Sequence, residues 1–118
     1  MQALAGANLL VNISASNEMV GKHAYLRSLI EQQSARTMAA YLYSSAGCGE
    51  STTDIVFAGN GKIAENGAIL RESERFTFGE QLTLCDVDIE RLMALRGKTN
   101  TFTSESPQKE YRRIRAGL

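Results

Sequence analysis

The sequence predicts a mixed α/β fold, in which two buried, parallel-type strands flank a helix and are followed by an antiparallel hairpin or meander and a short helix. Three observations lead to this fold class. Residues 7–13 form a mostly apolar run. Residues 23–40 contain no Gly or Pro and carry apolar residues at helical spacing. Two Asn-Gly pairs, at 60–61 and 66–67, then separate short β-prone segments, which is typical of antiparallel hairpins.

The first half of the chain is predicted to form a strand, a helix and a second strand. The run 7–13 has the apolar character of a strand buried on both faces. Residues 23–40 are rich in good helix formers, so we expect a helix there. Tyr41-Leu42-Tyr43 predicts the second buried strand, and Gly47 and Gly49 are expected to end it.

The following segments predict an antiparallel meander. Residues 54–57 and 62–65 flank Asn60-Gly61, which is a strong signal for a two-residue hairpin turn. The second pair, Asn66-Gly67, leads into a third short strand at 68–70. We therefore expect three strands joined by two tight turns.

A further strand and a short helix are predicted next. Residues 81–87 read as the strand, Asp88 is placed to cap a helix, and Gly97 is placed to end it. After Lys98 the chain turns polar. Residues 98–118 are therefore expected to form a linker or docking tail.

Charge and composition exclude several classes of function. Thirteen Lys and Arg balance thirteen Asp and Glu, so no overall field favours nucleic acid or an anionic membrane. No apolar run is long enough to span a bilayer, and no basic segment precedes the first apolar stretch as in a signal peptide. With only two cysteines, a disulfide framework is not expected. We expect a cytoplasmic domain with neither nucleic acid nor a membrane as partner.

Cys48 lies between two glycines just after the second predicted strand, and this arrangement has two interpretations. A cysteine on a sharp strand-to-loop turn resembles a nucleophile, and His23, the sole histidine, would be its base. Alternatively, Gly47 and Gly49 only turn the chain. The cluster is not a phosphate loop, because no Lys precedes Ser51.

Asp86 and Asp88 form an Asp-x-Asp pair that could bind Mg²⁺ together with phosphates. A capping role for Asp88 at the start of a helix is the simpler explanation, because it requires no bound metal. We therefore expect no metal site.

Three polar residues follow the first predicted strand: Ser14, Ser16 and Lys22. Open α/β sheets tend to place ligand groups just beyond the ends of parallel strands. Hydroxyl groups offer adaptable hydrogen bonds, and an ammonium group provides a point charge for a carboxylate. The spacing therefore suggests a ligand site in this loop.

Several longer stretches, taken in order, resemble glutamine-dependent NAD+ synthetases. Ala-Leu-Ala-Gly-Ala at 3–7, running into 12–16 and Gly21-Lys22, resembles the segment that follows the nucleophile of that family. The further stretches that are similar are Ser-Ala-Arg at 34–36, the Gly-Glu-Ser-Thr-Thr-Asp loop at 49–54, Glu-Asn-Gly at 65–67, Glu-Ser-Glu-Arg-Phe at 72–76 and Asp-Val-Asp at 86–88. The likeness covers nearly the whole chain in order.

The resemblance implies part of a nitrilase-type (carbon-nitrogen hydrolase) α-β-β-α sandwich. Residues 1–97 would be the C-terminal portion of its glutaminase domain, and residues 98–118 the lead-in to an interdomain linker. In the family, a Glu-Lys-Cys triad hydrolyses glutamine, and ammonia passes to a synthetase domain that amidates nicotinic acid adenine dinucleotide with ATP. The triad positions lie upstream of residues 3–7, so no catalytic residue is expected in this sequence. ATP and Mg²⁺ would belong to the synthetase domain, and no cofactor is expected here.

The resemblance also assigns binding residues. Ser16 resembles the family's glutamine-binding serine, and Lys22 a basic glutamine-binding position in a Gly-Lys/Arg pair. Cys48 falls where the family varies, so it does not match the nucleophile.

Three hypotheses follow. The first is a glutaminase fragment, inactive alone. The second is a non-catalytic complementing half-domain that works only with a partner chain that supplies the triad. The expected partners are glutamine, the missing N-terminal glutaminase segment and the synthetase domain. The third is an independent hydrolase using Cys48 and His23. Because strands of a partial sandwich would lack neighbours, we also expect the chain to self-associate.

Overall fold

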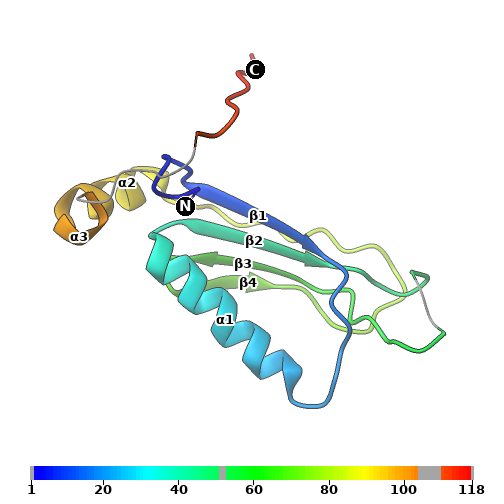
Figure 1. The fold of residues 1–118 in the computed structure, drawn as a ribbon. Helices are drawn as coiled ribbons and strands as arrows, with labels where there is room; N and C mark the ends of the chain where they lie inside the picture. Colours follow the sequence, from blue (N-terminus) through cyan, green and yellow to red (C-terminus); the bar gives the residue numbers. More distant parts are fainter. Residues whose placement is uncertain (1, 51–52, 104–109, 118) are drawn as a thin grey trace.

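The computed structural model describes residues 2–50, 53–103 and 110–117. It contains one four-stranded sheet in the order β1-β2-β3-β4, a long helix against one face, and two short helices beyond one end (Figure 1). The elements are β1 (Leu9–Ser14), α1 (Lys22–Thr37), β2 (Ala40–Ser45), β3 (Gly61–Glu65), β4 (Ala68–Glu72), α2 (Ile89–Lys98) and α3 (Asn100–Thr103). Strands β1 and β2 are parallel, and β2, β3 and β4 are antiparallel. The predicted α/β class is therefore confirmed.

The β1-α1-β2 unit matches the first half of the prediction, with shifted boundaries. The helix ends at Thr37 rather than at residue 40. Met38 takes a left-handed backbone with φ of 44°, and its N–H donates to the carbonyl of Ala35. After this turn the chain enters β2, which begins at Ala40 and pairs with β1 from Leu9 onward.

The predicted strand at 54–57 is wrong, because this segment has no regular secondary structure. Its backbone groups, and those just after it, bond to three separate parts of the chain instead of to one neighbouring strand. Glu18 N donates to Val56 O at 2.7 Å, Phe76 N to Ala58 O at 2.7 Å, and Gly59 N to the carbonyl of residue 46 at 2.9 Å.

The antiparallel meander exists, but β2 supplies its first strand. Asn60-Gly61 is consequently not a hairpin turn and leads directly into β3. Asn66-Gly67 does join β3 to β4, and both residues have positive φ, 45° and 93°. A two-residue turn of type I′ requires this backbone at both positions, which explains the Asn-Gly pair.

The predicted strand at 81–87 is also wrong: residues 80–88 carry no strand. The Gln81 side chain instead bonds to the backbone N–H and carbonyl of Glu74, at 2.9 and 3.0 Å, and so closes a loop. Asp88 caps α2 as predicted, since its carboxylate accepts from Arg91 N at 2.8 Å. The helix continues through Gly97 to Lys98, so the predicted end at Gly97 is wrong by one residue.

The core lies between α1 and one face of the sheet. Ile30 of α1 is buried against Tyr43 and Ala64, with Leu26, Tyr41 and Ile69 packed around them. This is a small core for a chain of 118 residues. Within the described residues, no helix is both long and apolar enough to cross a membrane.

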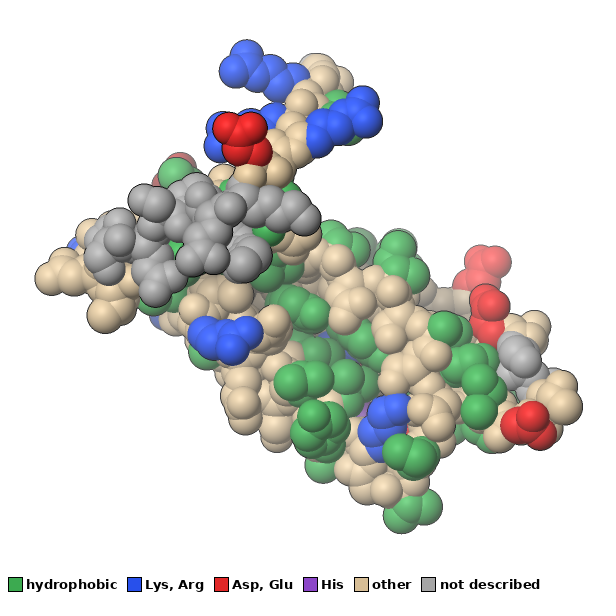
Figure 2. All heavy atoms as spheres, in the orientation of Figure 1, with side chains coloured by type: hydrophobic (Ala, Val, Ile, Leu, Met, Phe, Trp, Pro, Cys, Tyr) green, Lys and Arg blue, Asp and Glu red, His purple; other side chains and the backbone are tan. Residues whose placement is uncertain are grey.

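The opposite face of the sheet is apolar, and it is open along β1. The register aligns Val11 with Leu42 and Leu42 with Ile63, so the three side chains share this face. On β1, Val11 is 63% exposed and Ile13 is 85% exposed. Figure 2 shows the other side of the molecule, the one that carries α1, and hydrophobic side chains lie on that side as well. β1 is therefore not buried on both faces within the described residues.

Arg96 of α2 joins the helical end of the molecule to the sheet. Its guanidinium is buried and donates to Asn8 Oδ1 at 2.6 Å and to the carbonyls of Ala7, Thr37 and Met38 at 2.7–3.0 Å. These acceptors precede β1 and end α1. Burial lowers the pKa of Arg96, but an arginine stays charged at physiological pH.

We expect Arg96→Lys to lower the free energy of unfolding by about 2–3 kcal/mol, because a single ammonium cannot reach acceptors spread over four residues. Arg91→Lys on the same helix is the matched control, since the Arg91 side chain is 63% exposed. Urea unfolding of both variants measures the difference. Equal stability of the two would contradict the assigned role of Arg96.

Candidate functional site

The loops that follow β1 and β2 lie together at one edge of the sheet. The two strands are parallel and end opposite each other, at Ser14 and Ser45. Ala46 N then donates to Ser14 O at 2.8 Å, and Glu18 N to Val56 O at 2.7 Å. Residues 15–21 are thereby held against the loop that follows β2, at the edge where parallel strands commonly place ligand groups.

The structure places Ser16 and Lys22 in this region. Ser16 is half-buried in the loop after β1, and Lys22 is the first residue of α1. The Lys22 ammonium donates to the backbone carbonyl of Asn17 at 2.5 Å and to Asn17 Oδ1 at 2.9 Å. The ammonium therefore lies on the residue next to Ser16. A shared concave site for Ser16 and Lys22 stays a prediction.

A cleft of about 520 Å³ adjoins this loop. Its walls include Glu18, Met19 and His23 from the loop and α1, and Val56 and Phe76 from the facing segments. The cleft is bordered mainly by apolar side chains, of which Val56 is 60% exposed.

Gly47, which precedes Cys48, lies against Gly59. A Cβ on Gly59 would lie 3.0 Å from the Cα of Gly47, so the two backbones are in contact. Cys48 itself is exposed and not in a disulfide. His23 Nε2 lies 3.3 Å from Glu72 Oε1, which gives this nitrogen a partner other than Cys48.

Glu72 is the centre of a polar cluster between α1 and β4 that we did not foresee from the sequence. Its carboxylate lies 2.6 Å from Lys62 Nζ, 3.0 Å from Arg27 Nη1 and 3.3 Å from His23 Nε2. The Lys62 side chain is fully buried. His23 Nδ1 and Tyr43 Oη are also buried, with no hydrogen-bond partner among the described residues. The cluster ties the first turns of α1 to the sheet.

The cluster changes two pKa values. Burial and the Lys62 ammonium lower the pKa of His23, against the opposing effect of Glu72. The pKa of Glu72 is lowered as well. Burial would raise it, but the hydrogen bond and charge of Lys62, with His23 and Arg27, together outweigh burial.

Asp88, one of the two carboxylates considered as a possible Mg²⁺ site, makes hydrogen bonds at the start of α2. Its N–H donates to Glu65 Oε2 at 2.9 Å while its side chain caps the helix. Across the part of the chain that the structure describes, no three His, Cys, Asp or Glu side chains are grouped as a metal site would need.

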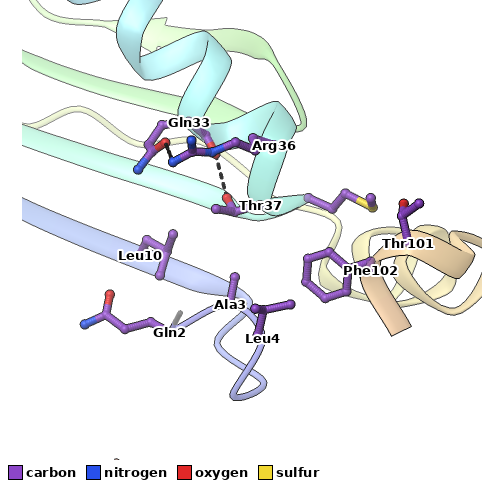
Figure 3. A pocket seen from close by; sticks show the side chains of 10 residues that line it. Gln2, Ala3, Leu4, Leu10, Gln33, Arg36, Thr37, Thr101 and Phe102 are labelled. Atoms are coloured by element: carbon purple, nitrogen blue, oxygen red, sulfur yellow. Dashed lines mark hydrogen bonds between the residues drawn. The ribbon is translucent and has the colours of Figure 1, made fainter. Parts of the chain in front are cut away.

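A second cleft, of about 510 Å³, lies at the opposite end of the molecule (Figure 3). Its apolar side chains come from the N-terminal segment, from β1 and from α3 and include Leu4, Leu10 and Phe102. Three of its polar residues bond to one another: Arg36 donates to Gln33 Oε1 at 2.8 Å, and Thr37 Oγ1 donates to Gln33 O at 2.7 Å. Neither Ser16 nor Lys22 lines either cleft.

The Glu72 cluster predicts a pH-dependent stability. Since the pKa values of His23 and Glu72 are lower in the folded state, the unfolded chain binds more protons as the pH falls, and the free energy of unfolding decreases. The decrease should begin near the ordinary His value of 6.5 and continue through that of Glu, 4.5. Thermal unfolding followed from pH 8 to pH 3 measures it.

Glu72→Gln should remove the more acidic part of this profile and cost about 3 kcal/mol at neutral pH, because Lys62 loses its countercharge. Glu31→Gln is the control, since Glu31 contacts Arg27 from the surface of the same helix. An acid profile unchanged by Glu72→Gln would contradict the role of the cluster.

Comparison with known proteins extends this description. No family model matches the chain. Over 100 residues it is 48% identical to the glutamine-dependent NAD(+) synthetase of Mycobacterium tuberculosis, and this match covers 85% of the chain and 15% of the relative. The Drosophila melanogaster enzyme of the same name is 34% identical over 115 residues, covering 95% of the chain and 14% of the relative. The chain therefore spans about a seventh of the length of these relatives.

Two solved structures are similar in fold. A glutamine-dependent NAD(+) synthetase from Cytophaga hutchinsonii has a TM-score of 0.62 and 28% identity, over 65% of this chain and 13% of that one. A carbon-nitrogen hydrolase from Helicobacter pylori G27 has a TM-score of 0.69 and 16% identity, over 87% of this chain and 39% of that one, and shows the fold alone. The chain thus matches a segment of the glutamine-dependent NAD(+) synthetases and forms part of a nitrilase-type (carbon-nitrogen hydrolase) fold.

Proposed function

We propose that these residues form part of the glutamine-hydrolysing domain of a glutamine-dependent NAD+ synthetase and supply one wall of its glutamine site. The observation that carries the proposal is the 48% identity over 85% of the chain, which sets it among enzymes named for their use of glutamine. In the complete protein, ammonia from glutamine would amidate nicotinic acid adenine dinucleotide in a synthetase domain that uses ATP and Mg²⁺. The setting we propose is cytoplasmic.

Ser16 and Lys22 are the proposed glutamine-binding residues. The Lys22 ammonium offers a positive charge to the α-carboxylate of glutamine, and the Ser16 hydroxyl can donate or accept a hydrogen bond. Helix α1 begins at Lys22 and has no capping side chain and no acidic residue in its first turn. Its N-terminal dipole therefore adds to the positive potential in this loop.

The catalytic triad would be supplied by other residues of the glutaminase domain. We expect the 118-residue chain alone to release no ammonia from glutamine, because general acid-base and nucleophilic groups supply several powers of ten in rate. The remaining glutaminase residues, as another segment or another chain, would cover the open face of the sheet. The sandwich requires such a neighbour, since Val11 and Ile13 are otherwise in water.

Binding of L-glutamine to the chain, measured by isothermal titration calorimetry, tests the proposed site. We expect Lys22→Met to weaken binding about tenfold or more, as for the loss of a charged hydrogen bond, and Ser16→Ala to weaken it less. Ser28→Ala on the exposed surface of α1 is the control. Full glutamine binding by Lys22→Met would refute the site. Ammonia release that Cys48→Ser abolishes would favour an independent hydrolase.

The open sheet face predicts self-association of the isolated chain. Size-exclusion chromatography with light scattering should show species larger than a monomer, because contiguous exposed apolar surface favours association. Val11→Glu should shift the chain toward monomer, whereas Ile114→Glu, in the exposed C-terminal segment, should not. A monodisperse monomer with a sharp unfolding transition would show that the partial sandwich is self-sufficient.

A further inference from the structure

Lys22, at the start of α1, and Lys62, in β3, differ in their contacts. Lys62 is paired with the carboxylate of Glu72 at 2.6 Å. Lys22 has no carboxylate within ion-pair distance among the described residues, and its ammonium contacts the two oxygens of Asn17. Its positive charge is therefore held in place without being neutralised.

Asn17 is positioned to set the direction of this charge. It follows Ser16 directly, and Lys22 lies five positions further along the chain. Its bonds to the ammonium close the loop between β1 and α1 into a ring. A lysine side chain has four rotatable bonds, and two fixed acceptors select one of its many conformations. The Glu18 N–H, bonded to Val56 O at 2.7 Å, fixes the same loop from its other side.

We infer that Asn17 is a positioning residue, which holds the Lys22 ammonium beside Ser16 to receive the α-carboxylate of an amino-acid substrate. The inference rests on the proposed function and adds to it a residue that acts through Lys22 and need not touch the substrate. Ammonium groups have three donors, so two bonds to Asn17 leave one for the ligand.

The neutral amide is the central feature of this arrangement. An aspartate at position 17 has the same shape and accepts the same hydrogen bond. It also places a negative charge against the ammonium and close to the incoming carboxylate. Asn17→Asp therefore separates two roles: a residue that only closes the loop tolerates the change, whereas a residue that presents an unneutralised charge does not.

The test measures binding of L-glutamine and of its α-amide, which lacks the carboxylate, to the full chain. Asn17→Asp should weaken glutamine binding about tenfold through repulsion in a partly exposed site, and should change binding of the α-amide little. Gln33→Glu makes the same amide-to-acid change near the other end of α1 and is the matched control. Circular dichroism verifies that each variant is folded.

A second measurement examines the contact between Asn17 and the Lys22 ammonium without any ligand. Acylation of lysines by an activated ester, mapped by mass spectrometry, should modify Lys22 more slowly than the exposed Lys98. Asn17→Ala should remove this protection. Equal acylation of Lys22 in the unaltered chain and in Asn17→Ala would overturn the inference.

The outcomes separate the inference from the proposed function. Equal glutamine affinity of Asn17→Asp and the unaltered chain would overturn the inference alone. Failure of the unaltered chain to bind glutamine would overturn the proposed function and the inference together. Weaker binding of glutamine, unchanged binding of the α-amide and loss of Lys22 protection support both.

Discussion

The guanidinium of Arg96 holds together the parts of the chain that the small core cannot reach. Its donors satisfy backbone carbonyls before β1 and at the end of α1, together with the side chain of Asn8. These carbonyls lie at element ends, where backbone groups have no partner within a helix or strand. One buried side chain thus satisfies acceptors from two segments and anchors α2 to the sheet. Arg96 thereby links the residues just before β1 to those just before β2.

A second set of contacts determines where α1 begins. The Glu72 carboxylate binds Lys62 of β3 and two side chains from the first turns of α1, so the helix is fixed near the edge that carries Ser16 and Lys22. Hydrogen bonds between the loops after β1 and β2 close the same region. Together, the packed core, Arg96 and Glu72 hold α1 at its middle, end and start. The proposed ligand loop is consequently attached to rigid elements on both sides, which suits a site that must present a charge in one direction.

One face of the sheet lacks the second sheet that would cover it in a complete sandwich. A sheet in a sandwich packs its inner face against a second sheet, with helices outside. Here α1 covers one face, and on the other face Val11 and Ile13 of β1 remain largely exposed. The chain spans 15% of its Mycobacterium tuberculosis relative and 39% of a hydrolase that shares its fold. Both the exposed surface and the coverage agree with a partial sandwich.

The sequence by itself determined the features that depend on neighbouring residues. Helical spacing predicted α1, the Asn66-Gly67 pair predicted a turn because few residues accept positive φ, and Asp88 was identified as a cap from its place before a helix. The order of motifs also identified the related family.

Tertiary structure decided the rest. The segment 54–57 has strand-like composition, but no strand forms there, and the backbone of residues 56–59 bonds to three separate segments instead. Arg96 bonds to a residue 89 positions away, and Lys62 of β3 pairs with Glu72 of β4. Such pairings depend on which faces meet after folding, and no local pattern in the sequence records that.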